Sequence, residues 1–162
     1  LTMGMSTDAL LVYGYHLGGD DAGWLVHGAG EYGELPPLDW YDAEAHDGEG
    51  FQESAEKRLL AQLADFTETD WQADGYFARE RAAKARLGVR FETHCSGDYP
   101  MYLLIAKGIT AWRGKTEEID FAALQDEMRQ TDADTKLRAA LNALGLRPTQ
   151  ERAQWLLCSY WG

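Results

Sequence analysis

Residues 101–112 restrict the fold more than any other part of the chain, because they are apolar at both odd and even positions except at Lys107 and Thr110. A strand with one face in water alternates apolar and polar residues, whereas a strand covered on both faces does not. We therefore expect residues 101–112 to form a central strand of a sheet.

Shorter patterns predict the other elements. Residues 89–95 alternate, and they predict a half-exposed strand that forms a hairpin with the central strand. Residues 9–16 and 154–161 are apolar and aromatic runs beside turn signals, and they predict two more strands. Helical periodicity and capping residues predict helices over 51–66, 74–87, 120–130 and about 131–144.

These elements predict one α+β domain spanning residues 1–162, with a mostly antiparallel sheet of about four strands and one layer of helices packed on it. The first helix has an apolar stripe formed by Phe51, Ala55, Leu59, Leu60, Leu63 and Phe66. In the second helix, Asp74 is the expected N-cap and Gly88 the expected glycine at the C-terminal end. A long acidic loop is expected at about residues 18–50.

The formal charge is divided unevenly along the chain. The 162 residues carry 27 acids, 15 Lys and Arg residues and a net charge of −12. Residues 1–56 contain 12 of the acids and no Lys or Arg, so this first third holds the whole excess. Nucleic acids and anionic membranes bind through basic side chains that neutralise phosphate. The charge pattern therefore argues against direct binding of nucleic acid or membrane.

The acidic loop also holds large aromatic residues, which predict that it packs at least partly on the body of the protein. One interpretation is a solvated acidic surface that maintains solubility. The other is a docking surface for a basic protein partner. One form of this second interpretation is a surface that imitates the charge of nucleic acid. For the docking surface we expect these partner-binding residues: Asp20, Asp21, Trp24, Asp39, Trp40, Tyr41, Asp42, Glu44, Asp47 and Glu49.

Catalytic chemistry has weaker support in the sequence. His94 and Cys95 are adjacent, but neighbouring strand residues point to opposite faces, so His94 is poorly placed to activate Cys95. A cysteine enzyme would need Cys95 or Cys158 beside a distant histidine. The candidate histidines are His16, His27 and His46.

The acids around His46 resemble a cation-binding cluster, but the spacing from Asp42 to Asp47 departs from the calcium-loop pattern. We therefore expect a non-enzymatic binding protein with no catalytic residue, metal site or cofactor. A small cysteine- or metal-dependent hydrolase or transferase is the alternative.

Two further features bear on the setting of the protein. The chain has no apolar run of ~18 residues, and residues 1–11 lack the pattern of a signal peptide. Cys95 and Cys158 are too few for a disulfide framework. We therefore expect a cytoplasmic protein, whose oligomeric state the sequence leaves open.

Three segments, residues 8–19, 96–102 and 156–162, resemble those of small uncharacterised proteins encoded by actinobacterial phages and prophages. The resemblance implies an accessory protein that acts on host or phage machinery, with recognition favoured over turnover. It supplies no catalytic residue to transfer to this chain.

Overall fold

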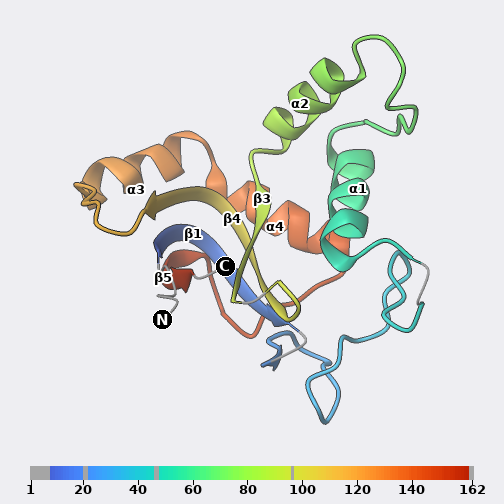
Figure 1. Cartoon of the computed structure of the whole chain (residues 1–162), viewed down its shortest axis with the longest axis horizontal. Helices are drawn as coiled ribbons and strands as arrows, with labels where there is room; N and C mark the ends of the chain where they lie inside the picture. Colours follow the sequence, from blue (N-terminus) through green and yellow to red (C-terminus); the bar gives the residue numbers. More distant parts are fainter. Residues whose placement is uncertain (1–7, 20–21, 46–47, 96, 161–162) are drawn as a thin grey trace, which may run out of the picture.

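The computed structural model describes residues 8–19, 22–45, 48–95 and 97–160. These ranges form an α+β fold with an antiparallel sheet, as the sequence predicts (Figure 1). The elements in chain order are β1 (Asp8–Gly19), β2 (Gly23–Trp24), α1 (Phe51–Leu63), α2 (Tyr76–Leu87), β3 (Arg90–Cys95), β4 (Pro100–Ala111), α3 (Phe121–Gln130), α4 (Ala133–Leu144) and β5 (Gln154–Tyr160).

The long strands β1 and β4 form the centre of the sheet and pair along nearly their whole lengths. β3 pairs with β4 as the expected hairpin partner. On the other edge of β1, β5 pairs with residues 8–14 and the short β2 pairs with residues 18–19. Every pair is antiparallel, so the predicted sheet is confirmed.

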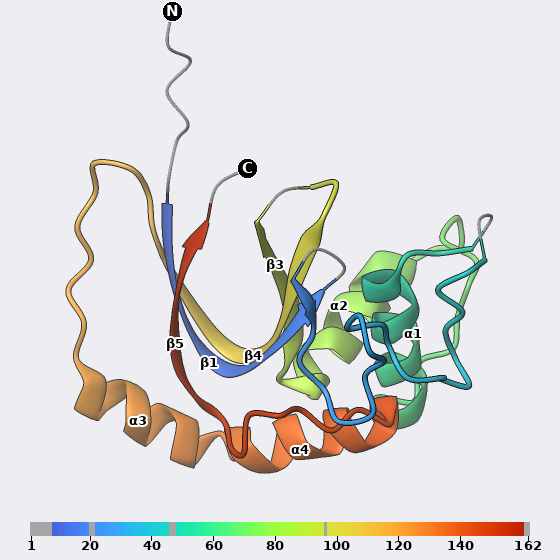
Figure 2. The same cartoon turned by 90° about the horizontal axis from the view of Figure 1, so that it is seen from below.

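The sheet is strongly curled. Figure 2 shows it as a trough, with α3 and α4 beneath its convex side and α1 and α2 beyond one end. The β1–β4 register shifts between Tyr13 and Gly14 and again between His16 and Gly18. Such bulges bend a strand and increase its twist. As a result the outer strands β3 and β5 approach to within 8 Å between Cα atoms.

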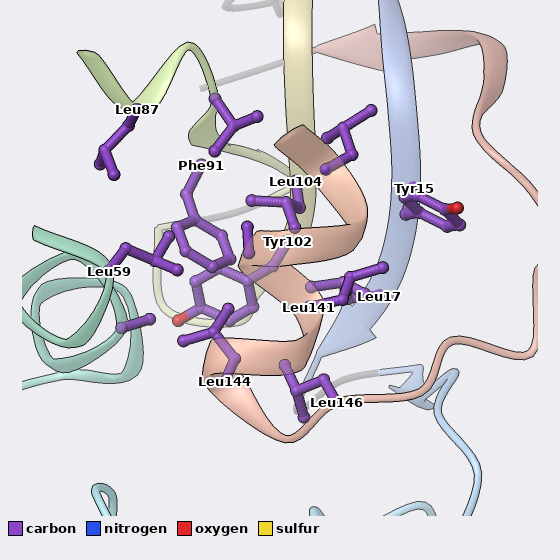
Figure 3. Close-up of a cluster of buried hydrophobic side chains, with 14 of the residues drawn as sticks. Tyr15, Leu17, Leu59, Leu87, Phe91, Tyr102, Leu104, Leu141, Leu144 and Leu146 are labelled. Carbon is purple, nitrogen blue, oxygen red and sulfur yellow. The ribbon is translucent and has the colours of Figure 1, made fainter. Parts of the chain in front are cut away.

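Apolar side chains are buried on both faces of this sheet. On the convex side, Tyr102 and Leu104 of β4 join the main core with leucines of α1 and α4 (Figure 3). On the concave side, the alternate residues Leu103 and Ile105 form a smaller cluster with Leu10 and Val12 of β1. The expectation that the central strand is covered on both faces is confirmed over residues 102–105. The curl of the sheet, rather than a second layer of helices, encloses the concave cluster.

The helices follow their predicted patterns, with three differences. α1 ends at Leu63 rather than at residue 66 as predicted, so Phe66 lies beyond the helix. In the apolar stripe of α1 only Leu63 is exposed, at 42%. The expected N-cap Asp74 is wrong, because α2 begins one residue later, after Gly75 at a φ of 73°. Gly88 ends α2 in the left-handed conformation, as predicted. None of the described helices has the length and apolar character to cross a bilayer.

Tyr13 gives the fold a pH dependence at alkaline pH. Its hydroxyl donates a hydrogen bond of 2.6 Å to Oδ1 of Asp134, and burial together with this carboxylate raises the pKa of Tyr13 to about 12. Folding thus favours the neutral phenol. The stabilisation is complete below the ordinary tyrosine pKa of ~10, and it is lost as the pH rises through about 12.

We expect the free energy of unfolding of the wild type to fall between these pH values by roughly 2–3 kcal/mol more than that of Tyr13→Phe. Urea unfolding of both proteins across this pH range measures the difference. Tyr15, whose pKa burial also raises, is present in both and cancels. Equal pH dependence in the two proteins would show that Tyr13 does not titrate differently on folding.

Candidate partner-binding surface

Trp24 fixes the start of the acidic loop to the core. Its side chain is only 6% exposed and stacks on Tyr102, with ring centroids 5.3 Å apart and planes 9° apart. The ring of Phe51, at the first turn of α1, lies 4.6 Å from it. The backbone here also bonds to the segment after α4, since the amide of His27 donates to the Arg147 carbonyl at 2.8 Å. The start of the loop is therefore held both by the core and by the segment after α4.

Trp40 and Tyr41 fix the middle of the same loop. Nε1 of Trp40 donates to the carbonyl of Leu144 at the end of α4, at 2.9 Å. Both rings pack against Phe51, with centroids 5.6 and 5.5 Å away. Trp40 and Tyr41 therefore pack against the core.

The described carboxylates of the loop point outward instead. Asp39 forms an ion pair of 3.3 Å with Arg58, and Glu49 pairs with Lys57. In the part of the chain that is described, Glu31, Asp42 and Glu44 form no ion pair, and all three are exposed. Oδ1 of Asp42 accepts a hydrogen bond from the amide of Glu44, which fixes the local turn. The loop thus presents uncompensated negative charge on a backbone held by buried aromatic rings.

The predicted partner-binding residues separate into three groups. Trp24 is buried, and Trp40 and Tyr41 are partly buried against the core. The exposed members are Asp39, Asp42, Glu44 and Glu49. Asp20, Asp21 and Asp47 lie outside the described residues, as does His46. Tyr32, an aromatic residue of the loop that is not in the predicted partner-binding set, is 84% exposed.

Next to the loop lies a groove between α1 and α2, which the sequence analysis did not find. It consists of two hollows of about 410 and 440 Å³ that share Glu56, Leu60 and Lys84 as walls. Figure 1 shows α1 and α2 joined by a long connection. The apolar lining of the groove comprises Leu59, Leu60, Phe66, Leu87, Val89 and Phe91.

Trp71 lies at one end of this groove and is 62% exposed. It belongs to the connection between α1 and α2, where its amide donates to the Thr69 carbonyl at 3.0 Å. Large exposed aromatic residues are frequent anchors in protein interfaces. The only sequence signal was a single tryptophan in a polar segment without periodicity.

Carboxylates and cations both line the groove. Glu53, Glu56, Glu68 and Glu80 line it. The cations nearby already have carboxylate partners: Lys57 with Glu49 and Glu53, Lys84 with Glu80, Arg79 with Glu68, and Arg90 with Glu92. Glu56 pairs with no cation and accepts a hydrogen bond from Gln52. Lys136 also reaches the groove beside Gly88, so the charges around it are nearly balanced.

The candidate catalytic groups are placed less favourably. Cys95 and Cys158 are free thiols on the opposite outer strands β3 and β5. Burial raises the pKa of the Cys158 thiol, which disfavours the thiolate that a nucleophile needs. Burial and the neighbouring His16 lower the pKa of His94. Among the described residues, no three His, Cys, Asp or Glu side chains are grouped so that they could hold a metal ion.

No family model, curated protein or solved structure matches this chain. The function must therefore be argued from the geometry of the surface itself.

Proposed function

We propose that the protein is a non-enzymatic binding protein whose acidic loop docks on a basic partner protein. The observation that carries the proposal is the combination of buried anchors and free carboxylates in one loop. Trp24 and Trp40 hold the backbone against the core, while Glu31, Asp42 and Glu44 stay exposed without a cation partner. A charged surface that is already ordered loses little conformational entropy on binding.

Steering by such a surface acts through long-range attraction and selects partners with complementary charge. Because Trp24 and Trp40 hold parts of the loop backbone against the core, the loop favours one arrangement of Lys and Arg over others. An accessory role in phage or prophage biology, which the resemblance of three segments suggests, fits a binder of host or phage proteins.

The test is capture of partners from a cell lysate, followed by measurement of the dissociation constant for the purified partner. The loop variant carries Glu31→Gln, Asp42→Asn and Glu44→Gln, three exposed side chains that pair with no described cation. We expect this variant to bind at least about tenfold more weakly, with a shallower dependence on salt, because exposed charges are screened over ~8 Å at physiological ionic strength.

The matched control removes the same charge elsewhere. Glu117→Gln, Glu118→Gln and Glu151→Gln also change three exposed carboxylates that pair with no described cation. This control should bind as tightly as the wild type. Equal weakening in both triple variants would point to net charge alone, and unchanged binding in the loop variant would refute the docking role of the loop.

A further inference from the structure

An open hollow lies where the segment after α4 runs back along this helix (Figure 2). Its volume is about 420 Å³, within the usual range of ~300–1,000 Å³ for ligand sites. The buried side chains of Tyr15, Leu141 and Leu146 form its floor. The bottom of the hollow is therefore continuous with the core.

Residues 147–150 form one wall of the hollow, and their backbone bonds to the start of the acidic loop. The carbonyl of Arg147 accepts a hydrogen bond from the amide of His27 at 2.8 Å. The amide of Thr149 donates to the carbonyl of Leu25 at 2.9 Å. The backbone that carries Arg147 is therefore held in place by the fold itself.

Two arginines and a histidine line this hollow. Arg138 comes from α4, Arg147 from the wall segment, and His27 from the acidic loop. In the described part of the chain neither arginine forms an ion pair, and Glu151 is the only carboxylate in the lining. Two arginines against one carboxylate leave a positive excess even with His27 neutral. This excess stands out in a chain whose net charge is −12.

Arg138 has a carboxylate one helical turn away, but that carboxylate is engaged elsewhere. Asp134 accepts the hydrogen bond of 2.6 Å from the hydroxyl of Tyr13 and forms no ion pair with Arg138. At the floor of the hollow, burial raises the pKa of Tyr15; Asp134 adds to this rise and Arg138 opposes it. The charge of Arg138 therefore reaches the floor of the hollow and is free to attract an anion there.

We propose that this hollow binds a small phosphate monoester, with the phosphate group held between Arg138 and Arg147. Such a phosphate is close to a dianion at pH 7. Arginine donates paired, charge-assisted hydrogen bonds to phosphate oxygens, and these are stronger than bonds between neutral groups. The ring of His27 has a further N–H to donate. Asn142 and the hydroxyl oxygen of Thr149 line the rest of the hollow and can bond to hydroxyl groups of the ligand.

Glycerol 3-phosphate is the probe, and ¹H–¹⁵N NMR spectra of the full chain both locate it and give its dissociation constant. We expect saturable binding with a dissociation constant of about 1 mM or lower. The largest shifts should fall on residues 138–151 and on His27. Glycerol alone should not bind. Inorganic phosphate should bind more weakly than the monoester, because it makes no contact with Asn142 and Thr149.

Three single substitutions test the roles of the charged residues. Arg138→Gln and Arg147→Gln should each weaken binding of glycerol 3-phosphate at least about tenfold, because each removes charge-assisted hydrogen bonds to the phosphate. Glu151→Gln should strengthen it about threefold, because it removes an exposed carboxylate that repels the ligand.

Arg113→Gln is the matched control. Arg113 is exposed, forms no ion pair within the described residues and does not line the hollow. Its replacement removes the same charge and should leave the affinity unchanged. Circular dichroism confirms that each variant is folded.

Several results would overturn the inference. Equal weakening by Arg113→Gln and Arg138→Gln would show attraction by net charge alone. Equal affinity for inorganic phosphate would assign the hollow to the free ion instead of a monoester. Equal shifts caused by sodium chloride at the same ionic strength, or shifts that fall elsewhere, would also refute the site. No described carboxylate of the acidic loop lines the hollow, so this inference and the docking role of the loop can fail independently.

Discussion

Replacing Gly14 by alanine should lower the free energy of unfolding by about 3 kcal/mol, the upper part of the usual range for overpacking a buried site. Gly14 lies at a bulge in β1, pressed against β4. An added Cβ would overlap the carbonyl oxygen of Leu104 and lie 2.8 Å from Cα of Ile105. Both obstacles are backbone atoms of the central strand, so they cannot move aside as a flexible side chain would.

Thermal unfolding measures this effect, and the melting temperature should fall by roughly 6–12 °C at ~2–4 °C per kcal/mol for a chain of this size. Gly97→Ala is the control, because a Cβ at Gly97 meets no atom within 4 Å. It should change the stability by less than about 0.5 kcal/mol. A Gly14→Ala protein as stable as Gly97→Ala would mean that the two central strands are not packed as closely as described.

Replacing Trp24 by alanine should cost about 3–5 kcal/mol, as for other large buried aromatic residues. The substitution removes the stacking on Tyr102 and the contact with Phe51, and it leaves a cavity between the sheet and α1. Because Trp24 also fixes the start of the acidic loop, the effect should extend beyond stability. Amide hydrogen exchange over residues 22–45 should become faster even where the sheet stays protected.

Tyr32→Ala provides the comparison within the same loop. Its ring is 84% exposed, so its loss should change the unfolding free energy by less than about 0.5 kcal/mol and leave the exchange of the loop unaltered. Similar stability losses in the two variants would contradict the role of Trp24 as an anchor.

The regular elements could be predicted because their signals are local. The two-residue period of 89–95 and the unbroken apolar run after it depend only on neighbouring residues, and both strands are where they were expected. Gly88 and Gly145 end their helices because the left-handed conformation there favours glycine. The prediction of Asp74 as the N-cap was wrong because Gly75, in the left-handed conformation, occupies the N-cap position instead.

Features that depend on distant contacts could not be predicted. The curl of the sheet follows from bulges in the pairing of β1 with β4. The paired residues of these two strands are about 90 positions apart in the chain. The acidic loop has no period, so its sequence does not reveal that Trp24 and Trp40 turn inward while Glu31 and Asp42 face solvent. The groove requires the relative placement of α1 and α2, which no local pattern encodes.

The position of β1 between β4 and β5 also shapes how the chain folds during synthesis. Val12 pairs with Gly108 and Leu156, 96 and 144 positions further along the chain. At a synthesis rate of about 5–20 residues per second, roughly 7–30 s pass between the synthesis of β1 and that of β5, its last pairing partner. The segment synthesised directly after it has no Lys or Arg up to Glu56. The like charge of this segment opposes association between neighbouring nascent copies while β1 lacks its partners.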